Sequence, residues 1–489
     1  MAINPAQPIP IYYQLKTLLL EEILSGRYGP EARLPTEHEL CDQYAISRTP
    51  VSRALSELAD EGVILRHRRR GTFVNPHWLA RRPDQPEVRV VVSEGPWGDL
   101  LRHAATDERQ VNLVTVPLRS LHQILTHAVA EGQAPDLAIL DSVWIPEFAA
   151  DGFLRELDDL DEDWFRDEHE RDFLEPIVEA NRYKGRTFGV SPFANIAGFW
   201  YRRSAVKALG LPPPRTWSEL RSVGRAAAEN GLPHPIVMTG GSQGGETTAY
   251  CLIAFLESNG ARVLASEGVT LDSRATAQAL RFLRSLIDDG LMSIDVLGYE
   301  WTKPVRLLAE GKAAISFGGS YETRTLAEAL DVRLDELWDH VGFMPVPAGP
   351  AGMPATVAGT MSYGIFRQAQ QPVLAMRLLQ RAVAPEELAR VARATGRIPA
   401  RRSAVSLAAP SPQFLAQTVD MLERATLRPS TPLYPRVSAQ LQSMLEATLT
   451  GRLGAAAAAR RTAELIGAIT GLPVLHEVDP ASATATVAR

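Results

Sequence analysis

Residues 36–74, TEHELCDQYAISRTPVSRALSELADEGVILRHRRRGTFV, decide the fold of the first part of the chain. Thr36 and Glu39 form a capping box that starts a short helix, because the hydroxyl and the carboxylate each satisfy a free backbone N–H group. Ser47 is the expected N-cap of the next helix, and Pro50 falls in its first turn, where a missing N–H costs little. This stretch therefore predicts two helices joined by a tight turn.

The flanking segments extend this unit on both sides. Apolar residues recur at helical spacing over 11–24, which predicts a helix before the pair. Gly62 ends the helix that Ser47 begins, and residues 63–74 alternate as two short strands around a basic turn. Three helices and a two-stranded hairpin are expected within residues 1–75.

The helix that follows Ser47 has one apolar and one polar face. Val51, Leu55 and Leu58 share the apolar face, and the opposite side carries Thr49, Ser52, Arg53 and Ser56. Short polar side chains and arginine can reach base edges and phosphates in a DNA major groove. The turn with Arg68, Arg69 and Arg70 can lie along a phosphate backbone or enter the minor groove. The sequence thus predicts DNA binding.

Four motifs in this order resemble the GntR family of winged-helix regulators: RLPTE at 33–37, ISRTPVSRAL at 46–55, EGVI at 61–64 and GTFV at 71–74. The resemblance implies DNA contacts by Arg33, Ser47, Arg48, Thr49 and the wing around Gly71. Together with the residues above, the expected DNA-binding set is Arg33, Thr36, Ser47, Arg48, Thr49, Ser52, Arg53, Arg68, Arg69, Arg70, Gly71 and Thr72.

This chain departs from the family pattern at three positions. The family has threonine at Pro50, arginine at Ser52 and often glycine in the wing at Arg69. Arg53 follows Ser52 directly and is a candidate substitute for the missing arginine. Wing contacts are expected to be stronger and less selective for sequence, because a charge replaces a glycine.

Bulk properties indicate further domains. The chain has 489 residues, 45% hydrophobic and 22% charged, which is typical of a folded protein with more than one domain. The net charge of -6 argues against a protein coated in nucleic acid, so a DNA-binding face must be local. Prolines within 76–87 predict an interdomain linker. Beyond it, strand patterns at 88–92, 111–116 and 136–140 alternate with helical ones, which predicts an α/β layer.

Nearly everything after the linker resembles an extracellular solute-binding protein of the family that delivers sugars to ABC transporters. The segments that carry the likeness are APDLAILD at 134–141, KGRTFG at 184–189, LPPPRTWSEL at 211–220, GKAAISFGGSY at 311–321 and PVPAG at 345–349. The chain is thus expected to be multidomain, with an α+β winged helix-turn-helix followed by an α/β two-lobed domain of the type II periplasmic-binding-protein kind.

The resemblance suggests boundaries for this second domain. It is expected over 88–477, with a first lobe at 88–194 and 299–344 and a second lobe at 195–298 and 345–477. Residues 478–489 are expected to be a disordered tail.

A sugar presents flat C–H faces to aromatic rings and hydroxyls to carboxylates, amides and arginine. Ligands of α/β sheets sit at the carboxyl ends of strands, which the segments 93–97 and 141–144 directly follow. The expected ligand-binding residues are Trp97, Asp141, Trp144, Asn195, Gln243, Glu246, Trp301, Ser320, Tyr321 and Arg397, with Phe193 as a further aromatic candidate.

Two other functions compete with this one. Gly240 to Gly244 fits a nucleophile elbow with Ser242 between a strand and a helix, which would make the chain a serine hydrolase with a DNA-binding appendage. Only His340 and His476 lie downstream to complete a triad, so no catalysis is expected. A regulator of a non-sugar solute, such as a polyamine, peptide or metal chelate, is the other alternative. No cofactor or metal is expected, since neither the cysteines nor the histidines have metal-ligand spacing.

The favoured interpretation is a ligand-responsive transcriptional repressor. A homodimer would place two winged helices on a pseudo-palindromic double-stranded DNA operator. A small carbohydrate would close the two lobes of the sensor domain and so alter the spacing of the two winged helices. No export signal and no membrane span are recognised, so a cytoplasmic protein is expected.

Overall fold

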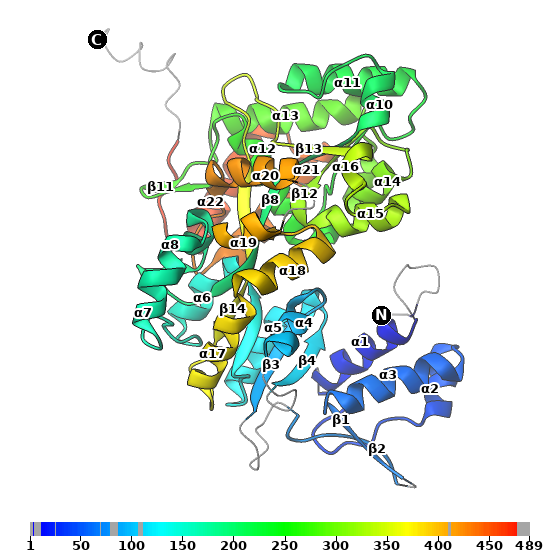
Figure 1. The fold of residues 1–489 in the computed structure, drawn as a ribbon. Helices are drawn as coiled ribbons and strands as arrows, with labels where there is room; N and C mark the ends of the chain where they lie inside the picture. Colours follow the sequence, from blue (N-terminus) through cyan, green and yellow to red (C-terminus); the bar gives the residue numbers. More distant parts are fainter. Residues whose placement is uncertain are drawn as a thin grey trace.

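The computed structural model describes residues 3, 11–24, 26–68, 70–78, 87–105, 111–408 and 412–476. A small N-terminal unit lies beside the first of two larger lobes (Figure 1). A mixed sheet of ten strands runs through both lobes. Arg69, most of the expected linker and the expected tail at 478–489 lie outside the described residues.

The N-terminal unit is the expected winged helix-turn-helix. It consists of α1 (Ile11–Leu24), α2 (Glu37–Tyr44), α3 (Arg48–Asp60), β1 (Ile64–His67) and β2 (Gly71–Val74), and the two strands pair antiparallel. The capping box of Thr36 and Glu39 is present at the start of α2. Ser47 is the N-cap of α3, although its side chain makes no capping hydrogen bond. Val51, Leu55 and Leu58 are buried as expected.

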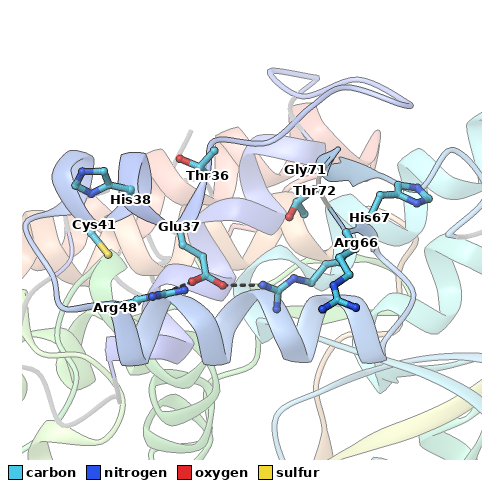
Figure 2. A pocket seen from close by; sticks show the side chains of 10 residues that line it. Thr36, Glu37, His38, Cys41, Arg48, Arg66, His67, Gly71 and Thr72 are labelled. Carbon is cyan, nitrogen blue, oxygen red and sulfur yellow. Dashed lines mark hydrogen bonds and ion pairs between the residues drawn. The ribbon is translucent and has the colours of Figure 1, made fainter.

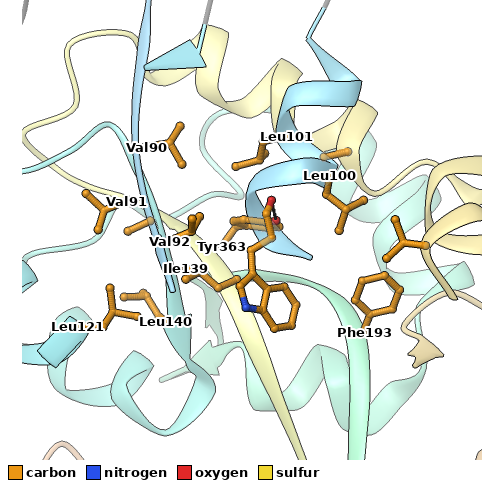
Figure 3. Packing of buried hydrophobic residues seen from close by; sticks show 14 of the residues in the cluster. Val90, Val91, Val92, Leu100, Leu101, Leu121, Ile139, Leu140, Phe193 and Tyr363 are labelled. Carbon is orange, nitrogen blue, oxygen red and sulfur yellow. Dashed lines mark hydrogen bonds between the residues drawn. The ribbon is translucent and has the colours of Figure 1, made fainter. Parts of the chain in front are cut away.

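The first lobe is built on three parallel strands in the order β4 (Val111–Val116), β3 (Val88–Ser93) and β5 (Leu137–Asp141), followed by the antiparallel β14 (Val357–Ile365). Every residue of β3 is buried, which explains its valine-rich sequence, since a central parallel strand is covered on both faces. Figure 3 shows this core, where side chains of β3, α4 and β5 meet Phe193 and Tyr363.

Helices cover this sheet and short elements complete the lobe. The long helices are α4 (Trp97–Ala104), α5 (Leu118–Ala130), α17 (Pro372–Ala382) and α18 (Pro385–Thr395), with α17 packed on α4. The remaining elements are η2 (Ser142–Trp144), α6 (Ile145–Ala150), α7 (Glu162–Trp164), η3 (Phe165–His169), α8 (Glu170–Asp172), α9 (Glu175–Ala180), β6 (Arg182–Tyr183), β7 (Arg186–Thr187), β15 (Ile398–Pro399), α19 (Arg402–Leu407), the longer α20 (Pro412–Glu423) and β16 (Thr426–Leu427).

The second lobe contains β9 (Ile236–Val237), β12 (Ile315–Gly319) and β13 (Val341–Met344), which lie in the same sheet. Its helices are α10 (Arg203–Ala208), α11 (Trp217–Glu229), α12 (Glu246–Glu257), α13 (Arg274–Asp288), α14 (Lys303–Ala309), α15 (Thr323–Leu330), α16 (Leu337–His340), α21 (Tyr434–Leu449) and α22 (Ala455–Thr470), with η4 (Ser242–Gly244), η5 (Ile294–Gly298), η6 (Ser320–Glu322), β10 (Leu264–Ala265) and β11 (Gly268–Val269) between them.

A single long strand, β8 (Val190–Arg202), joins the lobes. Its first half pairs with β14 and β15, and its second half pairs with β12 and β13. β14 and β16 also run together between the lobes as a parallel pair. The lobes are therefore connected by continuous hydrogen-bonded strands.

The division of the chain between the lobes differs from the expected one. Residues 299–344 are expected in the first lobe, but β12 pairs with β9 and with residues 197–201 of β8, which places it in the second. Residues 345–477 are expected in the second lobe, but β14 and α17 within this range belong to the first. The order of strands in a sheet is set by contacts far apart in the sequence, which a pattern of motifs does not contain.

Candidate functional site

A concave surface lies between α2, the start of α3 and the hairpin of the N-terminal unit (Figure 2). It is lined by Thr36, Glu37, His38, Cys41, Arg48, Arg66, His67, Arg68, Gly71 and Thr72. Five of the expected DNA-binding residues thus meet on one face. Ser47, Thr49 and Arg70 are also exposed, and Ser52 is half-buried.

An ionic bridge organises this surface. Glu37 accepts hydrogen bonds from Arg48 Nε at 2.8 Å and from Arg66 Nη2 at 2.7 Å (Figure 2). Arg66 also donates to Ser56 Oγ at 3.2 Å. The hydrogen bond from Arg48 is the largest cause of a lowered pKa at Glu37, and the hydrogen bond from Arg66 lowers this pKa further. Two guanidinium groups share one carboxylate, so the bridge has net positive charge and can bind phosphate. Glu37 and Arg66 were not predicted, although Glu37 stands within one of the motifs that were.

Arg33 supports the wing. Its guanidinium lies over Gly71, where a Cβ would be 2.9 Å from Arg33 Nε. Gly71 also has a φ of +113°, a conformation that favours glycine. The segments RLPTE and GTFV pair with each other, as the hydrogen bond of 2.9 Å from Leu34 N to Thr72 O shows. The two motifs therefore have a packing reason to occur together.

Arg53 lies on the other side of α3. Its Cζ is 3.7 Å from the ring centroid of Tyr12 in α1, and its Nε donates to Glu57 at 3.2 Å. Arg53 does not line the concave surface that contains Arg48 and Arg66. The proposed substitution of Arg53 for the missing arginine at Ser52 is therefore not supported by its position in the free protein.

An ionic cluster joins the two lobes. Arg428 follows β16 and binds Asp141 of the first lobe with Nη2 at 2.8 Å and Glu246 of the second with Nη1 at 2.9 Å. Tyr434 and Ser438 each donate to Glu246 at 2.6 Å. The Arg428 side chain is only 6% exposed. Asp141 and Glu246 are expected ligand residues, and the structure shows them bound to an arginine that the sequence did not single out.

Burial dominates the electrostatics of this cluster. It raises the pKa of the Glu246 carboxyl, and the Arg428 guanidinium opposes this rise. The two carboxylates hold the pKa of Arg428 well above its ordinary value, against the opposing effect of burial. The charge on Arg428 is therefore already balanced within the protein.

A second group of predicted residues gathers on one face of β8. Ile398 pairs with Ala194 and Pro399 with Phe193, so the same register places Arg397 opposite Asn195. The Arg397 Cζ lies 5.0 Å from the ring centroid of Trp97. Trp97 in turn lies 6.3 Å from Phe193, which shares a face with Asn195 because residues two apart on a strand point the same way.

This group adjoins the ionic cluster. On the other side of β8, Asn195 pairs with Gly359 of β14. A Cβ on Gly359 would lie 2.8 Å from Arg428 Nη2, so the Arg428 guanidinium covers the same face of the sheet as Asn195. The absence of a side chain at 359 thus gives Arg428 room to reach Asp141 and Glu246.

The remaining predicted ligand residues are dispersed. In the second lobe Tyr321 contacts Thr247 through its hydroxyl at 3.2 Å and lies 5.9 Å from the ring of Trp301. Ser320 is buried and accepts a hydrogen bond from Ile196 N at 3.1 Å, which is a structural role. Trp144 packs edge-on against the His122 ring, and Gln243 is exposed.

Ser242 has no triad. It lies exposed in η4, and its side chain forms no hydrogen bond with a histidine in the described part of the chain. His476 binds Asp272 at 2.7 Å instead. The described residues also contain no cluster of histidine, cysteine and carboxylate side chains that could hold a metal ion. No helix among them is both long and apolar enough to span a bilayer.

The N-terminal unit contacts the first lobe through α1. Tyr13 is largely buried beside the Glu94 carboxylate, and burial first, then the charge of Glu94 and hydrogen bonding to it, raise the pKa of Tyr13. Glu94 also accepts from Leu118 N at 2.9 Å, and its backbone oxygen accepts from Trp97 Nε1 at 3.1 Å. Arg119 adds a 3.0 Å ion pair with Glu21 of α1. Trp97 and α1 are thus linked through one residue.

Comparison with known proteins gives two family matches. Residues 11–74 match the model of bacterial regulatory proteins of the gntR family, and residues 85–388 match that of bacterial extracellular solute-binding proteins. A putative binding protein of Brucella abortus is 26% identical over 313 residues, which are 62% of this chain and 73% of that protein. The transcriptional repressor NagR of Bacillus subtilis is 47% identical over 75 residues, 15% of this chain and 31% of its own length.

The fold is shared with solved solute-binding proteins. The ABC-transporter solute-binding protein of Thermotoga lettingae, solved with α-D-tagatose, superposes with a TM-score of 0.71 at 20% sequence identity, covering 79% of this chain and all of its own (100%).

Proposed function

Because this chain belongs to the bacterial extracellular solute-binding protein family and carries a gntR-family domain, we propose that it is a transcriptional regulator whose DNA binding responds to a small carbohydrate. The winged helix is the output, and the two-lobed domain is the sensor. A repressor that the sugar releases from its operator is favoured, since the NagR relative is a repressor. Such a protein would act in the cytoplasm, where its DNA lies.

The observation that carries this proposal is the docking of α1 on the first lobe, where Glu21 pairs with Arg119 at 3.0 Å and Tyr13 lies beside Glu94. Glu94 follows β3, at the carboxyl end of a parallel strand, where ligands of such sheets bind. The next helix begins with Trp97, beside Arg397 and Asn195. A ligand that moves Trp97 would act on Glu94 through the indole hydrogen bond, and through Glu94 on α1.

Lobe closure supplies the energy in this proposal. A ligand changes DNA affinity only through its different affinity for the two states, and couplings of about 1–3 kcal/mol are typical, or roughly 5- to 150-fold in affinity. A homodimer would place two winged helices on successive major grooves, so that small shifts in their spacing change operator occupancy.

The first prediction tests the sensor and its coupling. Full-length protein is screened by thermal shift against mono- and oligosaccharides, and each hit is added to band-shift assays with operator DNA. We expect a hit to change operator affinity at least several-fold, and Tyr13→Phe to reduce this change while the sugar affinity stays within about twofold, because only the hydroxyl that binds Glu94 is lost.

Tyr12→Phe is the matched control, since it removes the neighbouring hydroxyl and keeps the ring that packs under Arg53. A full response in Tyr13→Phe would contradict the coupling route. Sugars that bind without any change in operator affinity would contradict the regulator itself, and binding of another solute class alone would contradict the choice of carbohydrate.

The second prediction concerns the wing. Arg68→Gln combined with Arg70→Gln should weaken operator binding and lower the slope of log affinity against log salt by about 0.9 for each phosphate that is no longer neutralised. Fluorescence anisotropy measures the operator affinity and its salt slope. Titrations between roughly 50 and 200 mM salt are suitable, because affinity for DNA falls steeply over this range. Arg377→Gln, at an exposed position of α17, is the control. An unchanged slope in the double variant would show that the wing does not touch phosphate.

A further inference from the structure

Arg397 stands between Gly396, the left-handed C-cap of α18, and the short strand β15. It is half-buried beside Trp97. Its guanidinium has no hydrogen bond and no ion pair with any residue that the structure describes. A half-buried arginine has lost part of its hydration, so an anion bound to it is attracted more strongly than by a fully solvated one.

Three arginines of this domain are buried more deeply than Arg397, and each is paired with a carboxylate. Arg89 lies 3.4 Å from Asp136, Arg401 lies 2.6 Å from Asp172, and Arg428 lies 2.8 Å from Asp141. Burial lowers the pKa of Arg397 to about 10, and among the described residues only the phenol of Tyr321 opposes this effect. The protein therefore balances these three charges, whereas no carboxylate in the described part of the chain pairs with Arg397.

A second unsatisfied group is next to it. The Asn195 Oδ1 atom is buried and has no hydrogen-bond partner among the described residues. The β8–β15 register places Asn195 opposite Arg397 on the same face of the sheet. A buried carbonyl oxygen requires a donor, whereas a guanidinium requires an acceptor. One ligand with an anionic group and a neighbouring hydroxyl would satisfy both.

We propose that the effector is an anionic carbohydrate, with its carboxylate or phosphate bound by Arg397 and a hydroxyl donated to Asn195. This inference rests on the proposed function, because it assigns the chemical class of the same ligand. Arg428 does not compete for the anion, since Asp141 and Glu246 already hold it. Tyr321 and Trp301 of the second lobe supply aromatic rings for the C–H face of the sugar.

The test compares sugars that differ only in the group at C6, which is neutral in the parent sugar and anionic in the other members. Calorimetric titration of the full chain uses glucose, glucuronate and glucose 6-phosphate, with galactose, galacturonate and galactose 6-phosphate as a second series. We expect at least one acid to bind at least ten times more tightly than its neutral parent, and the affinity to fall with salt, because a charge pair is formed. The carboxylate and phosphate members show which anion fits.

Variants locate the charge. Arg397→Gln should weaken binding of the acid by about 30-fold, a usual loss when one partner of a buried charge pair is removed. Arg397→Lys keeps the positive charge and should retain part of the affinity. This variant therefore distinguishes loss of the charge from a change in packing beside Trp97. Arg377→Gln removes an exposed charge and should leave binding unchanged.

The outcomes separate this inference from the proposed function. Neutral sugars that bind as tightly as their acids, or acids that bind Arg397→Gln as tightly as the parent protein, would overturn the anionic class and leave a carbohydrate regulator standing. No binding by any member of either series would overturn the anionic class, and the thermal-shift screen would then decide the wider proposal.

Discussion

Replacing Arg428 by leucine is expected to lower the free energy of unfolding by about 3–5 kcal/mol, the usual result of removing one partner from a buried ion pair. The Arg428 side chain is 6% exposed and binds both Asp141 and Glu246. Its loss would leave two carboxylates close together without a cation. Urea unfolding of the full chain, followed by fluorescence, measures the change.

A matched surface variant separates burial from charge. Arg424 is 77% exposed and pairs with Asp420 one helical turn away, so Arg424→Leu should cost at most about 0.5–1 kcal/mol. If Arg428→Leu costs no more than Arg424→Leu, the interlobe cluster contributes nothing to stability. Adding Asp141→Asn to Arg428→Leu should recover part of the loss, because the remaining repulsion between acids is removed.

Glu322→Gln is expected to stabilise the protein by about 4–5 kcal/mol at pH 8–9 and by little at pH 4.5. Glu322 is 1% exposed, and it accepts hydrogen bonds from Gly319 N at 2.9 Å and Trp200 Nε1 at 3.1 Å. Burial raises the pKa of this carboxyl to about 8, although these two hydrogen bonds lower it. A glutamine carbonyl can accept the same bonds and never ionises.

Proton linkage explains why the stabilisation by Glu322→Gln increases with pH. In the unfolded chain the carboxyl loses its proton above about pH 4.5, whereas the folded protein keeps it until about pH 8. The native protein therefore loses stability as pH rises between these values, and the glutamine variant does not. Urea midpoints at about pH 4.5, 7 and 8.5, which bracket the two pKa values, give the difference. Glu328→Gln, at an exposed position of α15, is the control. A stabilisation of the same size at every pH would contradict the raised pKa.

Local signals in the sequence predicted the winged helix well. The Thr36 capping box, the Ser47 boundary and the apolar face of α3 depend on residues within a turn or two of one another, and all three are present. Glu37 was missed although it lies beside Thr36. Its role arises only when Arg48 and Arg66 are brought to it by the fold.

The interlobe site was predicted in part. Asp141 follows a predicted strand and Glu246 begins a predicted helix, and the structure places both at the cluster. Arg428 lies 287 residues from Asp141 and 182 from Glu246, and no local pattern marks it. Ser320 stands in a Gly-Gly-Ser motif that favours a ligand site, but its hydroxyl binds the backbone at Ile196. A sequence motif identifies a polar residue, but the group to which that residue binds is set by the topology of the fold.

The docking of α1 has a consequence for how the protein would work on DNA. Its contacts with Glu94, Arg119 and Ser120 involve the first lobe. On an operator, the winged helix and the first lobe would form the stationary body, and the second lobe would be the moving one. Any rearrangement that releases the DNA would then have to pass through this body, by way of the contacts that α1 makes with the first lobe.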